Sequence, residues 1–265
     1  MKKSILIAVM AVILGGSIAA YFYWQQHRRQ PEPVHLQAAP PPPAPKPVVQ
    51  QVIETAPAQP PLPKLSESDK FILDTLAGLI GNNSLMRLFH TERIIHNIVA
   101  TIDNLPLSRA PLNVMPVKPV HGAFIAEGHE DDKTISPKNA ARYAPYVRVA
   151  EAIDAQKLVE AYVRLYPLFQ QAYEELGYPK KYFNDRLLVV LDNLLAAPDL
   201  KEPVKLVQPK VFYKFADPDL EARSAGQKIL MRMGSKNEAK IKAKLREIKR
   251  QVMLHMHDKK VDRGE

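Results

Sequence analysis

The chain contains no cysteine. This absence excludes a disulfide scaffold, a zinc site built on cysteine thiolates and a catalytic thiol. The short motifs of common catalytic and cofactor sites are missing as well, namely HExxH, GxSxG, the Walker A loop and GxGxxG. No internal repeat period is visible either. The sequence therefore assigns no activity and indicates no cofactor, and we leave the protein's status as an enzyme open, with a non-enzymatic role favoured.

Residues that could ligate a metal are present, but their spacing is not that of a metal site. One loop, His129–Asp132, holds a histidine and three acidic residues, a composition that is common in solvated turns. His255 and His257 would point about 200° apart on a helix, so they cannot chelate one ion together. His90 and His96, six positions apart, would also diverge. We predict no metal site.

Positive charge is concentrated at the C-terminal end. The formal net charge is +9, and the segment Lys228–Glu265 holds twelve Lys or Arg against five Asp or Glu. A solvated helix face explains this segment best, and binding of anionic lipid or an acidic wall polymer is the alternative. The last helix carries no aromatic residues between its basic ones, so nucleic acid is an unlikely partner.

An apolar run near the N-terminus has the length of a membrane span. Residues 4–24 contain no charge, and about 20 apolar residues suffice to cross a bilayer as a helix. Tyr21, Tyr23 and Trp24 at its end match an interfacial aromatic belt. The alternative is a cleaved signal peptide, with Ala19 and Ala20 near a cut site. Because the run continues past Ala20, we predict an uncleaved single-pass anchor over residues 1–30.

The orientation of this anchor follows from its position more than from its flanking charges. Lys2 and Lys3 nearly balance Arg28 and Arg29. A short N-terminus usually stays in the cytoplasm, and long following domains translocate largely regardless of charge. We therefore expect a bacterial inner-membrane protein whose C-terminal domain is periplasmic.

A proline-rich linker follows the anchor over residues 31–64. It holds twelve of the 24 prolines, a composition that favours polyproline II and forms no packed core. At about 3.1 Å per residue, the extended linker would span about 100 Å. It would hold the remaining domain well off the membrane, near the cell wall.

Residues 65–265 read as a mainly α, helical-bundle-like globular domain. A first helix is expected from an N-cap at Ser66 to Gly81, and a second from Ser84 to just before Pro106. Short helices should follow Ser136-Pro137 as far as Ile153. Residues 217–233 should form two further short helices. The final helix should begin with a Ser235–Glu238 capping box and bury a stripe made of Ile241, Leu245, Ile248 and Val252.

One or two short β-hairpins are expected beside these helices. Ala123–Ala126 can pair with Lys133–Ile135 across a polar turn. Val204–Phe215 alternates apolar and polar residues and is interrupted by Pro209, which indicates two short strands.

The densest aromatic region lies between Tyr162 and Ala197. Asp154 should cap its first helix, Pro167 should kink or split that helix, and Gly177 should end it before a second helix from Phe183. Tyrosines at helical spacing share one face, and they either fill the core or line a groove for glycan, peptide or another helix. The candidate binding residues are Tyr162, Tyr166, Tyr173, Tyr178, Asp185 and Arg186.

Acid–base chemistry in this region has one candidate. Asp185 and Arg186, near Arg142 and Tyr143, could form a buried ion-pair network, and a carboxylate with a raised pKa there could act as an acid or base. Glu174 and Glu175 are adjacent and face apart on a helix, so they do not form a catalytic pair.

Three runs resemble an uncharacterised family of bacterial proteins, domain of unknown function 3014. They are RYAPYV at Arg142–Val147, LYPLFQQAYEELGYP with YFNDRL in the aromatic region, and the run Gln208–Gly234. The resemblance implies a membrane-anchored bacterial protein and assigns no catalytic residue, cofactor or partner. The favoured hypothesis is thus a membrane-tethered binding or scaffold module of the envelope, which contacts the cell wall or another envelope protein. An enzyme acting on cell-wall glycan or peptide is the alternative.

Overall fold

The computed structural model describes residues 50–53, 61–129, 132–201 and 203–259. The chain divides into Met1–Val48 and Val49–Glu265, and every described residue belongs to the second part. The predicted anchor and most of the predicted linker lie outside the described residues. Within the described ranges, no helix combines the length and the apolar character needed to cross a bilayer.

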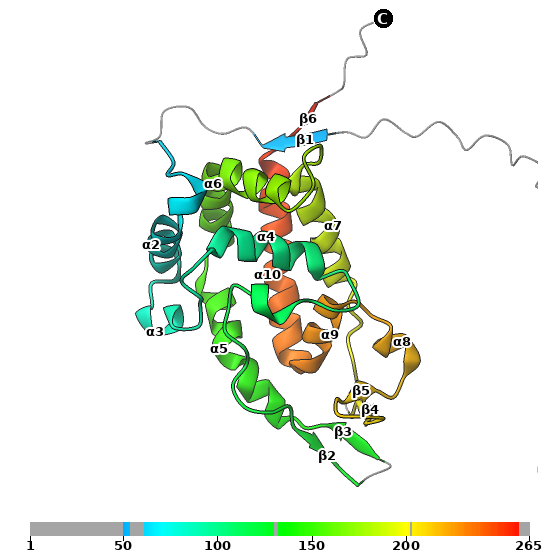
Figure 1. The fold of residues 1–265 in the computed structure, drawn as a ribbon. Helices are drawn as coiled ribbons and strands as arrows, with labels where there is room; N and C mark the ends of the chain where they lie inside the picture. Colours follow the sequence, from blue (N-terminus) through cyan, green and yellow to red (C-terminus); the bar gives the residue numbers. More distant parts are fainter. Residues whose placement is uncertain (1–49, 54–60, 130–131, 202, 260–265) are drawn as a thin grey trace, which may run out of the picture. The chain divides into compact units, whose positions relative to one another are not determined.

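The domain is mainly helical with a small antiparallel sheet, as its sequence pattern predicts. Its central element is the C-terminal helix α10 (Ser235–Leu254), which packs against helices from the middle and the end of the chain. These neighbours are α5 (Lys138–Ala152), α6 (Ala155–Glu175), α7 (Phe183–Leu195) and α9 (Ala225–Arg232). A further helix, α4 (Ile94–Asn104), packs across α6 and α7 (Figure 1).

Short elements complete the helical part. The 3-10 turn η1 (Leu65–Glu67) leads into α2 (Asp69–Ile80), which contacts α4, α5 and α6. Then come α3 (Asn83–Met86) and the 3-10 turn η2 (Leu112–Val114), and α8 (Pro218–Glu221) precedes α9. The predicted short helices at 217–233 are confirmed, and Ser224 forms a capping box with Gln227 at the start of α9.

Both predicted hairpins form, and they join into one four-stranded sheet. The strand order is β2 (Ala126–Glu127), β3 (Lys133–Ile135), β4 (Lys205–Val207) and β5 (Lys214–Phe215), with every pair antiparallel. Lys133 lies opposite Leu206, so the hairpins meet at β3 and β4. A small core of Val204, Leu206, Phe215 and Met231 lies beneath the sheet.

One further strand falls inside the span predicted as linker. The strand β1 (Gln50–Ile53) pairs antiparallel with β6 (Met256–Lys259). Residues 48–56 contain no proline, unlike the sequence on either side, so every backbone N–H in this stretch can donate.

The main core is built on aromatic rings from α6 and α7. Phe183 has no exposed surface, and its ring stacks on that of Phe169 with centroids 5.8 Å apart. Tyr162 meets Phe169 edge to face at 5.2 Å, and Tyr173 stacks on Tyr178 at 4.7 Å. Such pairs contribute about 0.5–1.5 kcal/mol each beyond the area they bury. The aromatic contacts between α6, α7 and the turn that joins them therefore contribute to the stability of the main core.

Two prolines lie inside continuous helices, so the separate short helices expected around Pro145 and the split expected at Pro167 are wrong. Pro145 lies within α5, a single helix of 15 residues where short helices were expected. Pro167 lies within α6, which runs unbroken for 21 residues and is not split. An internal proline costs about 3 kcal/mol. Around Pro167 the side chains of Val163, Leu165 and Leu168 are buried, and their burial offsets that cost.

The predicted N-cap at Ser66 is wrong, and the helix predicted to run from Ser84 to Pro106 is interrupted. The first α-helix begins at Asp69 after the η1 turn, and Gly81 ends it in a left-handed conformation (φ 66°), as expected. The second predicted helix divides into α3, which Asn82 caps, and α4, which begins only at Ile94. The segment between them forms one wall of the candidate site.

The final helix also departs from its predicted start. Gly234 is its N-cap and no side chain caps it, so the predicted Ser235–Glu238 capping box is wrong. Glu238 and Lys242 are instead buried, and their charged atoms lie 2.9 Å apart. Lys242 therefore does not belong to the solvated basic face on which the sequence places it.

Candidate functional site

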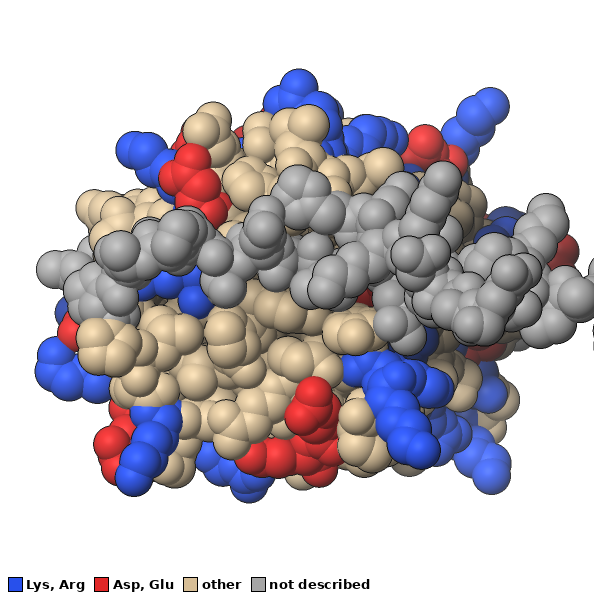
Figure 2. Space-filling view, turned by 90° about the horizontal axis from the view of Figure 1, so that it is seen from above, with Lys and Arg blue, Asp and Glu red and all other residues tan. Residues whose placement is uncertain are grey.

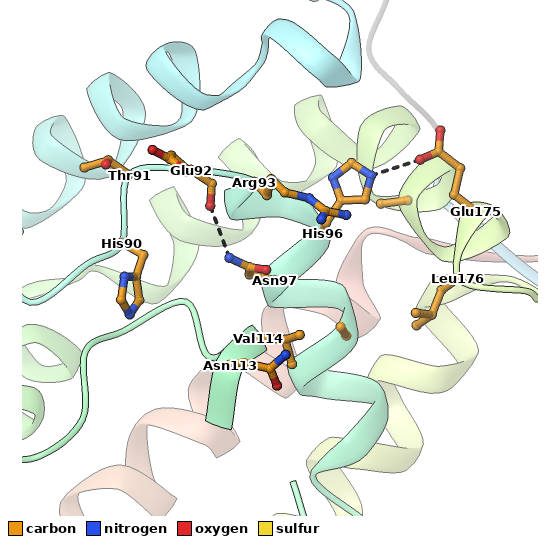
Figure 3. Close-up of a pocket in the computed structure, with 12 residues that line it drawn as sticks. His90, Thr91, Glu92, Arg93, His96, Asn97, Asn113, Val114, Glu175 and Leu176 are labelled. Atoms are coloured by element: carbon orange, nitrogen blue, oxygen red, sulfur yellow. Dashed lines mark hydrogen bonds and ion pairs between the residues drawn. The ribbon is translucent and has the colours of Figure 1, made fainter. Parts of the chain in front are cut away.

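A polar cleft of about 650 Å³ opens between the start of α4 and the end of α6. Its walls come from the loop before α4, from α4 itself, from η2 and from the last turn of α6 (Figure 3). The lining residues are His90, Thr91, Glu92, Arg93, His96, Asn97, Ala100, Asn113, Val114, Ala172, Glu175 and Leu176. The volume lies in the range of small-molecule binding sites.

The backbone of the cleft loop is held in a conformation that side chains disfavour. Arg93 has φ 51° and ψ 39°, and it is the only residue other than glycine with positive φ among those described. This left-handed conformation costs about 1–2 kcal/mol. The carboxylate of Asp69 on α2 offsets the cost by accepting the backbone N–H groups of Arg93 (2.7 Å) and Ile94 (2.9 Å). Strain that a distant residue maintains is typical of functional loops.

The same loop is fixed from its other side. The N–H of His90 donates to the carbonyl of Pro116 at 3.0 Å, and that of Lys118 donates to the carbonyl of Leu88 at 2.7 Å. The Asn97 amide donates to the carbonyl of Glu92 at 3.1 Å, which ties the loop to the first turn of α4 (Figure 3). The cleft wall is thus preorganised before any ligand binds.

A histidine and a glutamate face each other across the cleft. The imidazole Nε2 of His96 on α4 lies 2.9 Å from Oε2 of Glu175 on α6 (Figure 3). The side-chain amide of Gln171 donates to the other oxygen of Glu175 at 2.9 Å. The hydrogen bond from His96, followed by that from Gln171, lowers the pKa of the Glu175 carboxyl. Glu175 is therefore held in its ionised form.

Sequence reasoning missed this pair, because its members lie 79 positions apart. Glu175 was considered only with its neighbour Glu174, and His96 only with His90. Both histidines in fact line the cleft, because His90 precedes the helix and does not share its periodicity. Within the described part of the chain, no three His, Asp or Glu residues gather where they could hold one metal ion.

The predicted tyrosines lie in the main core. Tyr166 and Tyr173 are buried, and Tyr162 and Tyr178 are half-buried against the same cluster. The hydroxyl of Tyr162 donates to Oδ1 of Asn184 at 2.5 Å, and that of Tyr166 donates to Gln170 at 3.0 Å. Burial is the main cause that raises the pKa values of Tyr162, Tyr166 and Tyr173. These hydroxyls stay protonated at neutral pH.

Arg186 and Arg142, which the sequence places in one network, have other partners in the structure. Arg186 instead pairs with Asp103 on α4, with Nε and Oδ1 2.8 Å apart. Arg142 donates to backbone carbonyls of the loop before β2 and to the side chain of Asn139. Asp185 lies close enough to raise the pKa of Tyr166, as a contribution second to burial.

Asp103 is the other polar residue that the sequence did not single out. Its second carboxylate oxygen accepts the Tyr178 hydroxyl at 3.2 Å, so Asp103 joins α4 to the turn after α6 and, through Arg186, to α7. No local motif marks it, because its partners lie 75 and 83 positions away.

Comparison with known proteins gives one family. Residues 94–249 match the model of a family described as "Protein of unknown function (DUF3014)". This span is more than half of the chain, and it includes His96, Asn97, Asn113 and Glu175 of the cleft. No match was found among curated proteins or among solved structures.

Proposed function

Because the chain belongs to the DUF3014 family, whose description assigns no activity, we propose its function from the cleft. We propose a non-enzymatic binding module that recognises the cell-wall polymer in the cleft between α4 and α6. The observation that carries this proposal is the preorganised polar cleft itself, with a strained loop that Asp69 holds in place.

The lining of the cleft suits a sugar–peptide polymer. Amide, imidazole, hydroxyl and guanidinium groups line it, and each can form hydrogen bonds with hydroxyl, amide or carboxylate groups of a ligand. Ala100, Val114, Ala172 and Leu176 add apolar surface, against which the faces of sugar rings can pack. Polar side chains thus make up most of the lining, and the four apolar residues complete it.

The electrostatics of the cleft favour binding over hydrolysis. A general acid for glycosidic cleavage needs a raised pKa, so that it carries a proton to donate. In Glu175 the pKa is lowered, and both oxygens accept hydrogen bonds. Glu175 therefore serves to orient His96 and to offer a negative charge to the ligand.

An enzyme acting on the cell wall is the second candidate. One observation favours it: the hydrogen bond between His96 and Glu175 has the geometry of a general base that a carboxylate orients. Release of soluble fragments from purified sacculi by the full-length protein, abolished in His96→Ala, would replace the binding proposal with this one.

The location in the envelope is part of the same proposal. Residues 4–24 would anchor the chain in the bacterial inner membrane, and the proline-rich residues that precede β1, 31–48, would be the spacer that lets the domain reach the wall. An alkaline phosphatase fused after Glu265 should be active, since that enzyme folds outside the cytoplasm. An inactive fusion of normal abundance would contradict the periplasmic location.

Nucleic acid is not part of the proposal. Seen from above (Figure 2), Lys and Arg side chains lie in separate groups with neutral and acidic residues between them. On the part of this face that the grey residues leave visible, they do not form the continuous basic stripe that would follow a phosphate backbone.

Binding is tested by co-sedimentation of the full-length chain, in mild detergent, with purified sacculi. His90→Ala and Arg93→Ala each remove one donor from the cleft wall, and each should weaken binding about tenfold, the effect of one charged or well-placed hydrogen bond. His129→Ala and Arg87→Ala are matched controls at exposed positions outside the cleft. Equal binding by all four folded variants would sink the proposal.

A further inference from the structure

The loop that joins β4 to β5 carries the most exposed large apolar side chains of the described residues. Phe212 is 81% exposed and Val211 is 77% exposed, and Val207 on β4 adds a third apolar side chain at 45%. Single exposed apolar residues are ordinary on a protein surface, whereas a group of them marks an interaction site. None of the three belongs to the small core beneath the sheet or to the lining of the polar cleft.

Contacts from neighbouring elements hold the β4–β5 loop in this conformation. The side-chain amide of Gln208 donates to the carbonyl of Val211 at 3.1 Å, which closes the turn. The amide oxygen of Gln208 accepts a hydrogen bond from the ammonium of Lys133 at 3.3 Å. On the other side of the loop, the guanidinium of Arg232 donates to the carbonyl of Tyr213 at 3.2 Å. The backbone is thus fixed on both sides of Phe212, and its ring is presented to solvent.

Lysines flank this apolar tip. Lys210 and Lys214 lie on either side of it in the sequence, and both side chains are exposed. Among the described residues, the one ion pair at this hairpin joins Lys205 to Asp132 at 3.0 Å and does not include either of the flanking lysines. Both flanking charges are therefore available to an anionic partner.

Acidic residues lie away from the tip. Asp217 and Asp219 follow the end of β5 that is remote from the turn. Glu127 lies on β2, three strands from β5, which is about 14 Å at about 4.8 Å per strand. Glu130 and Asp131 of the other hairpin lie outside the described residues. Since exposed charges are screened beyond about 8 Å in physiological salt, the charge that accompanies the apolar tip is positive.

We propose that the β4–β5 loop docks on the surface of an anionic bilayer, with Phe212 at the acyl-chain boundary and its flanking lysines among the headgroups. Long lysine side chains place their charge at the headgroups while apolar neighbours enter the boundary. Anionic lipid attracts each such lysine. The three apolar side chains present well under the roughly 800 Å² per partner of a stable protein interface, whereas a fluid bilayer accommodates a protruding tip.

The proposal rests on the proposed anchor, residues 4–24, which would hold the domain beside a bilayer. The hairpin lies at the end of the domain opposite β1 (Figure 1). A compact unit the size of Val49–Glu265 has a radius of gyration of about 17 Å, which corresponds to a diameter of about 44 Å. The spacer 31–48 extends to about 55 Å, so it can pass along the domain and let the loop reach the same membrane. Membrane docking and wall binding would then alternate.

Tryptophan fluorescence of the full-length chain in vesicles tests the docking. Trp24 is the only tryptophan, so Phe212→Trp in a Trp24→Phe background places a single reporter at the tip. Brominated phosphatidylcholine should quench this reporter in vesicles that also contain phosphatidylglycerol, and at least fivefold less in vesicles without it. Val189→Trp in the same background is the control, since Val189 is an exposed apolar residue on α7, and it should not be quenched.

A pair of charge variants in the reporter chain tests the role of the lysines. Lys210→Gln with Lys214→Gln removes both flanking charges, and each lysine near an anionic surface strengthens binding about fivefold. Docking should therefore weaken about 25-fold. Lys157→Gln with Lys180→Gln removes two exposed lysines on other segments and should leave the quenching unchanged.

The outcomes separate the loop from the anchor. Quenching of Phe212→Trp no greater than that of Val189→Trp, or equal quenching with and without phosphatidylglycerol, would overturn the proposal. An emission shift that depends on chain concentration, without quenching, would show that a second copy covers the loop and would overturn it as well. Trp24 of the wild type reports the anchor: if it is quenched and the loop is not, the anchor stands and the docking fails, whereas an unquenched Trp24 would contradict the anchor itself.

Discussion

The buried pair on α10 leads to a sharp prediction about stability. Only 2% of the Glu238 side chain and 4% of the Lys242 side chain are exposed, and their charged atoms lie 2.9 Å apart. Lys242 also donates to the carbonyl of Ala197 and pairs with exposed Asp199 at 2.6 Å. The variant Lys242→Met removes all three interactions while keeping a side chain of similar length.

The expected loss in the free energy of unfolding is about 3–5 kcal/mol, the usual cost of leaving one buried charge without its partner. Such a loss is a large share of a domain's total stability of about 5–15 kcal/mol. Replacing both residues, as in Glu238→Leu with Lys242→Met, removes the unpaired charge and leaves only the Ala197 carbonyl without its donor. The double variant should therefore lose only about 1–3 kcal/mol.

The pH dependence of the stability lost in Lys242→Met tests whether the unpaired charge of Glu238 causes that loss. Burial raises the pKa of Glu238 in wild type, and the hydrogen bond and charge of Lys242 oppose that rise. In Lys242→Met the folded-state pKa therefore lies further above the unfolded value. The folded state then binds a proton that the unfolded state lacks, so the loss of stability should shrink as the pH falls towards the ordinary carboxyl value.

Urea unfolding of the full-length chain in mild detergent, followed by circular dichroism, measures these differences. Lys240→Met is the control, since Lys240 pairs with Glu151 at 2.8 Å but both side chains are about half exposed. It should change stability by about 0–1 kcal/mol. If Lys242→Met costs no more than Lys240→Met, the reasoning about burial is refuted.

Three further predictions concern the core and the cleft loop. Tyr162→Phe removes the hydroxyl that donates to fully buried Asn184 and should cost about 1–3 kcal/mol. Burial raises the folded-state pKa of Tyr162, so its contribution to stability is complete below about pH 10 and is lost at higher pH. As the pH rises from 9 to 11, Tyr162→Phe should therefore lose less stability than wild type. Equal pH dependence of the two unfolding free energies would contradict this. Asp69→Ala should cost about 1–2 kcal/mol and increase amide exchange at residues 92–95, and unchanged exchange would show that Asp69 does not hold the loop. Gly226→Ala would place a Cβ 2.4 Å from Cδ2 of Leu194 and 3.3 Å from the backbone oxygen of Leu105. The Leu194 side chain can rotate away but the backbone of Leu105 cannot, so the variant should cost about 1–3 kcal/mol in the same urea assay, where a neutral result would mean that the backbone at Leu105 gives way without cost.

Local sequence signals predicted most of the helices because their causes are local. Asp154 caps α6 through the N–H of Lys157 at 2.9 Å, and Gly177 follows its end with φ 114°. Capping and turn preferences act within a few residues, so they can be read without the fold. Local signals also predicted both hairpins. That the two hairpins join at β3 and β4 depends on the tertiary arrangement and could not be predicted in this way.

The errors came where packing outweighs local preference. Pro167 remains inside α6, where Val163, Leu165 and Leu168 around it are buried, and Pro145 remains inside α5, where Val147 is buried and the residues next to the proline are half-buried. Lys242 lies at a position that helical periodicity shares with solvated lysines, and only the approach of the segment after α7 buries it. Neither effect can be recognised from the residues of one helix alone.

The candidate site was the hardest part to predict. Its residues come from the loop before α4, from η2 and from α6, and the carboxylate that fixes its backbone comes from α2. No motif spans such separations. The tyrosines stood out because aromatic residues are conspicuous in a sequence, yet in the structure they fill the core to which the cleft elements are attached.

Hydrogen–deuterium exchange of the full-length chain with soluble cell-wall fragments tests the central claim most directly. If the cleft binds the wall polymer, saturating fragments should slow exchange in residues 90–100 and 172–176, and His90→Ala should weaken that protection. Exchange at residues 146–152 of α5, which do not line the cleft, should not change. Protection that lies away from the cleft, or no protection at saturating concentration, would contradict the account.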